Sequence, residues 1–186
     1  MLNINFNPFP VLETNRLVLR RIDNNDVNEV FALRSNPETM QFIPRPLVKN
    51  NDEALSHIKM INEKIDANEG INWVICTKNN PKFMGLLGLF KIYPENFRSE
   101  IGYMLLPEHN NQGYITEAIQ EVINYGFDVM NLHSIEAIID PENGASEKVL
   151  LKNGFKKEAH FVENMFAEGK FWDALVYSLL QRNRLK

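Results

Sequence analysis

The chain has 186 residues, of which 44% are hydrophobic and 24% are charged, and it contains nine glycines and nine prolines; this composition predicts one compact domain over residues 1–186. A chain of this length buries roughly 70% of the surface of its unfolded form, so its core needs no disulfide or metal, and a single cysteine excludes a disulfide framework. Twenty basic and twenty-four acidic residues give a formal charge of −4, which argues against general binding to nucleic acids or anionic membranes.

The first ten residues, MLNINFNPFP, contain neither a basic region nor an apolar stretch of the kind found in secretory signals. No apolar run of about 18 residues follows anywhere in the chain. We therefore expect a cytoplasmic protein that makes no membrane contact.

The first half of the chain predicts one strand, two helices and a meander. Alternation of apolar and polar residues predicts a strand over residues 12–22, and helical spacing predicts helices over 27–35 and 51–65. Three β-rich runs, at 71–77, 83–93 and 98–106, are separated by short Asn- and Pro-containing turns and predict antiparallel strands. The segment 36–50 contains three prolines and predicts an extended loop that is well placed to cover a site.

The second half alternates helices with strands. A helix follows Gly113 through Ile123, a strand covers 135–139, a helix covers 145–152, and two last strands meet at a turn around Glu168 and Gly169. The strand, helix and strand between residues 98 and 139 form a crossover unit, which sets two strands parallel. The predicted fold class is α/β, with the element order β α α β β β α β α β β.

The segment 107–118 has the pattern of a phosphate-binding turn. A strand ends at Pro107, a turn contains Gly113, and a helix begins directly afterwards, so that free main-chain N–H groups and the positive end of a helix dipole point to one place. Neither GxxxxGK[ST] nor GxGxxG is present, which excludes the common nucleoside-triphosphate and dinucleotide loops. The alternative is an ordinary strand–turn–helix with a glycine in its turn.

A second polar pair follows the strand at 135–139. Asn143 and Ser146 are three residues apart and so share one helical face at the end of that strand. Two polar side chains then face the cleft between the parallel strands. The alternatives are that Asn143 is a helix N-cap and that Ser146 is a solvated residue of the first turn.

Four segments in this order resemble the GNAT acetyltransferase superfamily, and within it the branch of Rim-type ribosomal-protein N-terminal acetyltransferases. They are ETNRLVLR at 13–20, EIGY at 100–103, QGYITEA at 112–118, and NGAS at 143–146 followed by NGF at 153–155. The resemblance covers nearly the whole chain. It implies a GNAT-like, mostly antiparallel central sheet with a splayed parallel strand pair, helices on both faces, and acetyl-CoA as cosubstrate.

The resemblance also assigns roles along the splay. It places the pantetheine arm of acetyl-CoA against one strand, the pyrophosphate on the following helix N-terminus, and the thioester beside the second polar pair. The residues implied are Met104, Leu105 and Leu106 for the pantetheine, Asn111, Gln112, Gly113, Tyr114, Ile115 and Thr116 for the pyrophosphate, and Asn143 and Ser146 for the thioester end.

Two features depart from the family pattern. Asn110 stands where the superfamily turn usually has Gln, Arg or an aromatic residue, and Ile115 stands where it usually has a small residue. We therefore expect Ile115 to crowd the phosphates while the main-chain cradle is kept. Leu150 stands where many relatives outside the Rim-type branch have a Tyr that protonates the departing thiolate. This chain therefore needs another acid.

The chemistry of acetyl transfer selects two catalytic candidates. The reaction needs a neutral amine, stabilisation of a developing oxyanion and a proton for the thiolate. Ser146 is the candidate acid or hydrogen-bond donor to sulfur, as its counterpart is thought to be in the Rim-type branch. Glu100 is the candidate base, acting through water, and its alternative is an edge charge that pairs with Arg98. A main-chain N–H near Leu105 would polarise the carbonyl.

Other polar and aromatic residues receive simpler interpretations. The four histidines are scattered without ligand spacing, so no metal site is expected. Cys76 is predicted to be a small core residue, and Phe42 and Tyr103 are candidates to line an acceptor pocket. Lys148 and Lys152 either meet the CoA 3′-phosphate or lie on a solvated helix face.

The sequence thus predicts an acetyl-CoA-dependent N-acetyltransferase, a monomer or homodimer, whose acceptor is a primary amine. A protein N-terminal α-amine is favoured, because near pH 7 roughly a tenth of an amine with a pKa of about 8 is neutral, against well under a thousandth at about 10.4. The acceptor is expected between the loop at 36–50 and the hairpin at 163–170, where Glu163 and Glu168 would attract a cation. Three alternatives stay open: a small-molecule amine as acceptor, a non-catalytic acyl-CoA-binding module, and a nucleotide-binding α/β protein.

Overall fold

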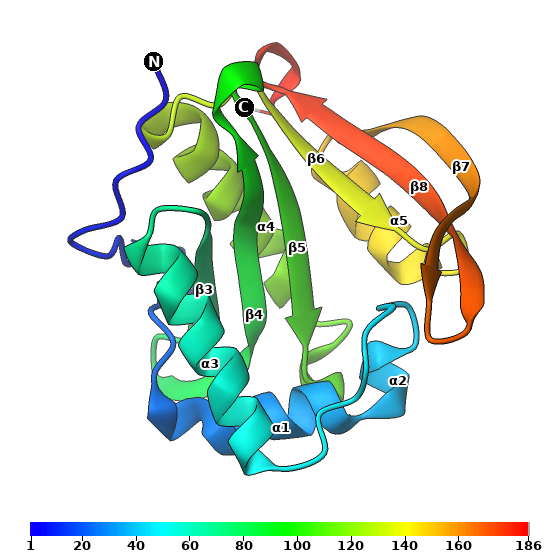
Figure 1. Cartoon of the computed structure of the whole chain (residues 1–186). Helices are drawn as coiled ribbons and strands as arrows, with labels where there is room; N and C mark the ends of the chain where they lie inside the picture. The colour runs from blue at the N-terminus through cyan, green and yellow to red at the C-terminus, as the bar shows by residue number, and fades with distance from the viewer. Residues whose placement is uncertain (186) are drawn as a thin grey trace.

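A computed structural model describes residues 1–185 of the chain, with the main chain alone for Asn80. Within them, eight strands form one sheet in the order β1-β2-β3-β4-β5-β6-β8-β7 (Figure 1). The strands are β1 (Leu12–Glu13), β2 (Leu17–Arg20), β3 (Ile71–Thr77), β4 (Asn80–Tyr93), β5 (Arg98–Leu105), β6 (Ser134–Ile139), β7 (Lys156–Ala167) and β8 (Lys170–Leu180).

The helices cover both faces of this sheet. They are α1 (Val27–Ser35), α2 (Pro37–Met40), α3 (Asn51–Asp66), α4 (Tyr114–Asn124) and α5 (Gly144–Lys152). Figure 1 shows α3 in front of the sheet and α4 behind it. Neighbouring strands are antiparallel except for β5 and β6, which are parallel. The predicted mixed, mostly antiparallel sheet with one parallel pair is confirmed.

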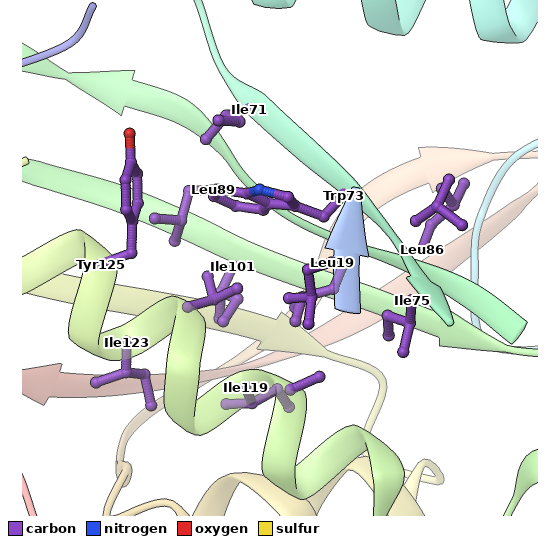
Figure 2. Packing of buried hydrophobic residues seen from close by; sticks show 14 of the residues in the cluster. Leu19, Ile71, Trp73, Ile75, Leu86, Leu89, Ile101, Ile119, Ile123 and Tyr125 are labelled. Atoms are coloured by element: carbon purple, nitrogen blue, oxygen red, sulfur yellow. The ribbon is translucent and has the colours of Figure 1, made fainter. Parts of the chain in front are cut away.

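Alternation along the central strands builds the core. Ile101 of β5 faces α4, where it lies with Ile119 and Ile123 in the cluster drawn in Figure 2. Trp73 of β3 is fully buried, its ring edge meets Tyr125 with centroids 5.4 Å apart, and its indole N–H donates to the Pro10 carbonyl at 2.7 Å. Burying such a ring with its N–H satisfied is strongly favourable. The long strands therefore give the functional edge of β5 a rigid support.

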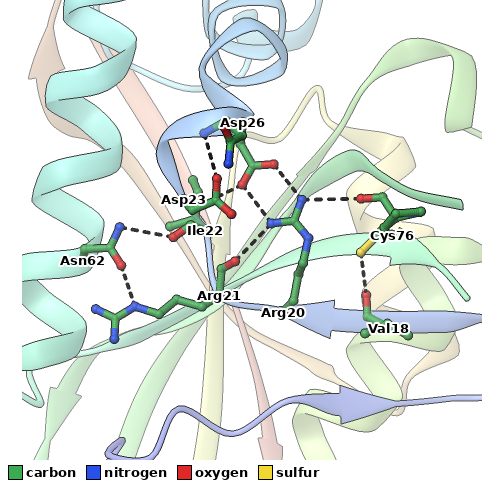
Figure 3. A network of polar contacts seen from close by, with 10 residues as sticks. Val18, Arg20, Arg21, Ile22, Asp23, Asp26, Asn62 and Cys76 are labelled. Atoms are coloured by element: carbon green, nitrogen blue, oxygen red, sulfur yellow. Dashed lines mark hydrogen bonds and ion pairs between the residues drawn. The ribbon is translucent and has the colours of Figure 1, made fainter.

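An ion pair fixes the first helix to the sheet. The guanidinium of Arg20 on β2 donates two hydrogen bonds to the nearly buried carboxylate of Asp26, at 2.6 and 2.9 Å (Figure 3). Asp26 also accepts from the main-chain N–H of Asp23 and so closes a capping box before α1. A bidentate pair of this kind restricts geometry as well as adding energy. The start of α1 is thereby held at a fixed place against β2.

The single cysteine lies in the sheet, as predicted. Cys76 on β3 is 1% exposed and its thiol donates to the Val18 carbonyl of β2 at 3.2 Å (Figure 3). Burial raises the pKa of this thiol. It is therefore a protonated core residue.

Two of the predicted elements differ from the structure. The strand predicted over 12–22 is two short strands, because Thr14 and Leu17 close a turn between them, with the N–H of Thr14 donating to the Leu17 carbonyl at 3.0 Å. The loop predicted over 36–50 contains the one-turn helix α2, which is capped by the side chain of Asn36. Elsewhere the predicted strands and helices are present with ends shifted by up to three residues, except that helix α4 continues into a π-turn over Tyr125–Val129. In the described part of the chain, no helix combines the length and the apolar character needed to cross a membrane.

Candidate functional site

The parallel strands β5 and β6 separate after three residue pairs. Pairing runs from Arg98 with Ser134 to Glu100 with Glu136 and then stops. Beyond that point β5 stays paired with β4 as far as Leu105, and β6 stays paired with β8 as far as Ile139. Figure 1 shows the two strands diverging from their shared end. The edge of β5 that faces β6 is thus left without a strand partner over residues 101–105, and its main-chain groups are available to a ligand.

The turn after β5 exposes a row of main-chain N–H groups. Asn111 and Gly113 both adopt left-handed conformations, with φ of 60° and 77°, and α4 begins directly afterwards. Within residues 1–185, the N–H groups of 111–116 donate no hydrogen bond to the protein. Free N–H groups at the positive end of a helix are a ready anion site. The predicted phosphate seat therefore has the required geometry.

The side chains of this turn differ in exposure. Asn111, Gln112 and Gly113 are exposed, and Tyr114, Ile115 and Thr116 are half-buried. Ile115 packs against the hydrophobic core. The structure thus gives Ile115 a packing role that the sequence pattern had not indicated.

Arg16, near the N-terminus, contacts the turn before α4 and the first residues of that helix. Its guanidinium contacts Glu117 on α4 at 2.6 Å, donates to the Gln112 carbonyl at 3.2 Å and lies 4.5 Å from the centre of the Tyr114 ring. Sequence reasoning placed Arg16 only within the resemblance and gave it no role in the site. The sequence distance of about a hundred residues hides this contact.

An open groove of about 760 Å³ runs beside the turn. Its lining includes Arg16, Gly113 and Thr116 on one side and Lys152 and Asn153 of the α5 end on the other. Lys152 therefore lies at the groove, whereas Lys148 is an exposed residue of α5. Either lysine's contact with a CoA phosphate stays a prediction.

Ser146 and Tyr103 meet across the separation of the strands. Ser146 on α5 is 8% exposed, and its Oγ lies 2.7 Å from the hydroxyl of Tyr103 on β5, where either oxygen can donate. Burial raises the pKa of Tyr103 to about 12, with the hydrogen bond to Ser146 opposing the rise, so the phenol is protonated at neutral pH. Sequence reasoning had offered Tyr103 only for the acceptor pocket. Tyr103 is two residues after Ile101 on the same strand, so both side chains point to the face that α4 and α5 cover. This spacing was the signal in the sequence.

Asn143 takes the role of helix cap. Its side-chain oxygen accepts from the main-chain N–H of Ser146 at 3.0 Å, at the N-terminus of α5. One lone-pair direction of Asn143 is thus used to orient Ser146. A contact of its amide with a thioester stays a prediction.

Glu100 is a buried carboxylate with one cation beside it. It is 7% exposed and lies 2.7 Å from Nζ of Lys91 on β4. The alternative pairing predicted with Arg98 is wrong, because Arg98 contacts Glu136 of β6 instead. Burial raises the pKa of Glu100, and Lys91 works against that rise. A carboxylate held this way is a better proton acceptor than a solvated one.

The predicted pantetheine residues lie along β5 and just after it. Leu105 and Leu106 are buried in the core, and the N–H of Leu106 donates to the Met84 carbonyl at 2.9 Å. Met104 is half-buried and its sulfur lies 4.0 Å from Nη1 of Arg34 on α1. Any contact that Leu105 and Leu106 make with a ligand must therefore be through the main chain.

The segments 36–50 and 163–170 were predicted to flank the acceptor. In the view of Figure 1 the tip of the β7–β8 hairpin and the segment after α2 are both drawn near the diverging end of β5 and β6. Glu163 is exposed and its N–H donates to Asp173, and Glu168 forms the hairpin turn with φ of 50°. Among the described residues, no cluster of three or more His, Cys, Asp or Glu side chains is arranged to hold a metal ion.

Comparisons with known proteins identify the family. A model described as an acetyltransferase (GNAT) domain matches residues 16–156. An uncharacterized N-acetyltransferase, YoaA of Bacillus subtilis (strain 168), is 34% identical over 173 residues, which are 93% of this chain and 98% of the relative.

Two solved structures extend the comparison. Spermidine N-acetyltransferase from Vibrio cholerae, in complex with CoA and spermine, has a TM-score of 0.80 and 25% identity over 91% of this chain and 98% of the other. RimL, a ribosomal L7/L12 alpha-N-protein acetyltransferase in complex with coenzyme A, has a TM-score of 0.83 and covers 92% of this chain and 98% of its own. Its 20% identity shows a shared fold alone, so membership of the Rim-type branch stays a prediction.

The family match and the near full-length relative agree with one another, and the strand separation is the one that the resemblance implied. They establish the reaction class and the cosubstrate. The chain belongs to the GNAT acetyltransferase family and is an acetyl-CoA-dependent N-acetyltransferase.

Proposed function

We propose that this protein acetylates a primary α-amine, such as a protein N-terminus, by direct attack of the amine on the thioester. The observation that carries the proposal is the hydroxyl pair of Ser146 and Tyr103 at the strand separation, with the free N–H groups of 111–116 at one end and Glu100 at the other. These three features would bind the cosubstrate, supply an acid and supply a base, which is sufficient for direct transfer without a covalent enzyme intermediate.

The residues of the turn would hold the pyrophosphate. Main-chain N–H groups of Asn111, Gln112, Gly113, Tyr114, Ile115 and Thr116 are free to donate, and phosphate oxygens accept several such bonds at a helix N-terminus. The edge of β5 that has no partner on the β6 side, at Met104 and Leu105, would align the pantetheine amides in the manner of an added strand, whereas the N–H of Leu106 already donates to Met84. These contacts would bring the thioester near α5.

Ser146 would donate a hydrogen bond or a proton to the sulfur as it leaves. The Tyr103 hydroxyl is placed to donate to Ser146 Oγ in turn, so the proton that the serine gives up can be replaced from the phenol. This pair supplies the acid that the leucine at position 150 cannot. A main-chain N–H near Leu105 would stabilise the charge that develops on the carbonyl oxygen.

Glu100 would accept the amine proton, through a water molecule. Its position at the last paired residue of β5 puts it where the strands begin to separate. Burial raises its pKa, which makes it a better proton acceptor than a solvated carboxylate. The proton moves from the amine to water and on to the carboxylate, and the C–S bond breaks as the C–N bond forms.

A second candidate acceptor is a small polyamine. The similarity to a spermidine N-acetyltransferase favours this candidate, and the exposed acidic residues Glu163 and Glu168 on the hairpin would suit a cation. The two candidates differ in charge: a polyamine is cationic throughout, whereas a peptide N-terminus has one amine and varied neighbours.

The test has two parts. CoA and acetyl-CoA should raise the melting temperature, since a ligand at about 100 times its Kd adds about 2.7 kcal/mol to stability. ATP and NAD should not. Release of free CoA thiol is then measured over N-terminal peptides, amino acids and polyamines. Binding of CoA without turnover of any amine would favour a non-catalytic acyl-CoA module, and no shift at millimolar CoA would overturn the cosubstrate assignment at this site.

A further inference from the structure

Arg34 of α1 is a buried cation without an anionic partner. It is 8% exposed, and within the described residues its Nε is buried and makes no hydrogen bond. Its single assigned contact is from Nη1 to the sulfur of Met104, at 4.0 Å. Burying an unpaired charge is costly, so such a group is normally completed by an anion.

Arg34 faces the same side of β5 as the candidate base. Glu100 and Met104 are four residues apart on one strand and therefore point to one face, whereas Ile101 and Tyr103 point to the other. Figure 2 shows Ile101 directed at α4. The guanidinium beside Met104 thus lies on the α1 and α3 face, where Glu100 also lies.

A second arginine adds to this charge. Arg45 is exposed on the segment after α2, and its charge, after burial, lowers the pKa of Arg34. Burial and then the charges of Arg34, Arg45 and Lys64 lower the pKa of His57 on α3 to about 4, so that this neighbour is neutral at pH 7. Arg45 also acts on Glu100, where it lowers the pKa against the larger effect of burial. Neither arginine forms an ion pair with a carboxylate in the part of the chain that the structure describes.

We infer that the acceptor is a primary amine that also carries a carboxylate. The carboxylate pairs with Arg34 and Arg45, and the amine lies beside Glu100. This inference rests on the proposed function and narrows its substrate class. Two sources have this chemistry: a free amino acid, and a peptide N-terminus with an acidic residue in its first positions. A polyamine lacks the carboxylate and would bring further positive charge to two unpaired arginines.

The first experiment measures binding without turnover. Protein saturated with CoA is titrated with N-acetyl amino acids and with N-acetylated tripeptides that contain Asp or Glu, each beside its amide counterpart at constant ionic strength. At least one acid should raise the melting temperature while its amide does not. Arg34→Gln and Arg45→Gln should remove that shift, Arg34→Lys should keep part of it, and Arg182→Gln, at an exposed arginine near the C-terminus, should keep all of it.

The second experiment measures turnover of the corresponding free amines. The acid of each pair should exceed its amide by about 10- to 100-fold in kcat/KM, the range expected for one hydrogen bond to a charged group. Arg45→Gln should reduce that ratio, and because Arg45 is exposed, this variant tests the inference even if Arg34→Gln does not fold. The class of substrate that shows the preference for the acid, free amino acids or peptides, identifies the source of the carboxylate.

Three results would overturn the inference: equal use of acids and amides, preference for spermidine that Arg45→Gln leaves unchanged, or no response to any acid while CoA still raises the melting temperature. Loss of the CoA response itself would overturn the proposed function instead.

Discussion

The hydroxyl groups of Ser146 and Tyr103 stand 2.7 Å apart although their residues are 43 positions apart in sequence. If Ser146 donates to the departing sulfur, Ser146→Ala should lower kcat by about 100-fold while CoA affinity changes little, because the interaction strengthens only in the transition state. Tyr103→Phe should lower kcat less, since Ser146 keeps its hydroxyl. Steady-state kinetics and CoA titration measure both. Full kcat in Ser146→Ala would leave catalysis to proximity and the main-chain oxyanion contact.

Glu100 and Lys91 allow the base to be tested by pH. Glu100→Gln should lower kcat/KM most at low pH and progressively less towards the amine's own pKa, where solution supplies the neutral nucleophile. Lys91→Met is the matched variant: it removes the cation that holds the pKa of Glu100 down, so the acid limb of the wild-type profile should move to higher pH. A uniform loss across pH in Glu100→Gln, with no movement in Lys91→Met, would point to a structural carboxylate.

The sequence offered Ser146 and Glu100 as candidates but did not indicate which residues contact them. Ser146 and Glu100 stand in short motifs, so their chemistry was open to prediction. The partner of Glu100 was not, because a bulge in β4 between Phe90 and Tyr93 decides which side chain meets it, and Lys91 sits in that bulge with φ of 47°. The unpaired state of Arg34 was also hidden, since it depends on every element around α1.

The predicted phosphate seat before α4 depends on the left-handed conformation of Gly113. Gly113→Val should abolish CoA binding, because φ of 77° is strained for a β-branched residue and the turn would rearrange to relieve it. Gly169→Val is the matched control: its φ of 78° in the β7–β8 turn is equally unfavourable, yet it lies in open space away from the cradle. Both variants should lose stability, but only the first should lose CoA binding in isothermal titration. Normal binding by Gly113→Val would place the cradle elsewhere.

Helix α3 contributes an acid-sensitive element. The pKa of His57 is lowered to about 4 in the folded chain. As the pH falls, His57 therefore becomes protonated near pH 6.5 in the unfolded chain but only near pH 4 in the folded chain. Between those values the unfolded state holds more protons, so the free energy of unfolding falls as pH falls, by on the order of 1 to 3 kcal/mol. His57→Gln should flatten this part of the profile in urea unfolding at pH 7 and pH 4.5. An identical slope in the variant would assign the loss to carboxylates.

Element boundaries were predictable where local patterns decide them. Asn36 followed by Pro37 is a helix start, and α2 was readable from it although the loop at 36–50 was expected to be irregular. The break between β1 and β2 was not readable: the hydroxyl of Thr14 donates to Glu117 at 2.5 Å, about a hundred residues away, and this contact competes with continuation of the strand. At Thr14, a contact with a residue distant in sequence outweighs the local alternation of apolar and polar residues.

At the scale of the whole molecule, chain order predicted the sheet but not its opening. The crossover between β5 and β6 follows from handedness rules, which made the parallel pair a sound expectation. That only three pairs form before the strands part depends on β6 pairing with β8, a strand more than thirty residues later. The cleft is thus a property of the complete sheet, and the resemblance implied it where local patterns did not.

The buried thiol of Cys76 allows the opening of the folded protein to be measured by thiol labelling. Because the chain has one cysteine and the folded state hides it, an aromatic disulfide reagent should label the native protein only as fast as the sheet opens, and should label one thiol per chain in denaturant. If opening and closing are fast relative to labelling, saturating CoA analogues that lack a thiol should slow this labelling by the factor 1 + L/Kd, where L is the concentration of the analogue. Stopped-flow and manual mixing cover the time range. Rapid labelling of folded protein would mean that β2 and β3 separate locally, and the same reagent would then overcount CoA released during turnover.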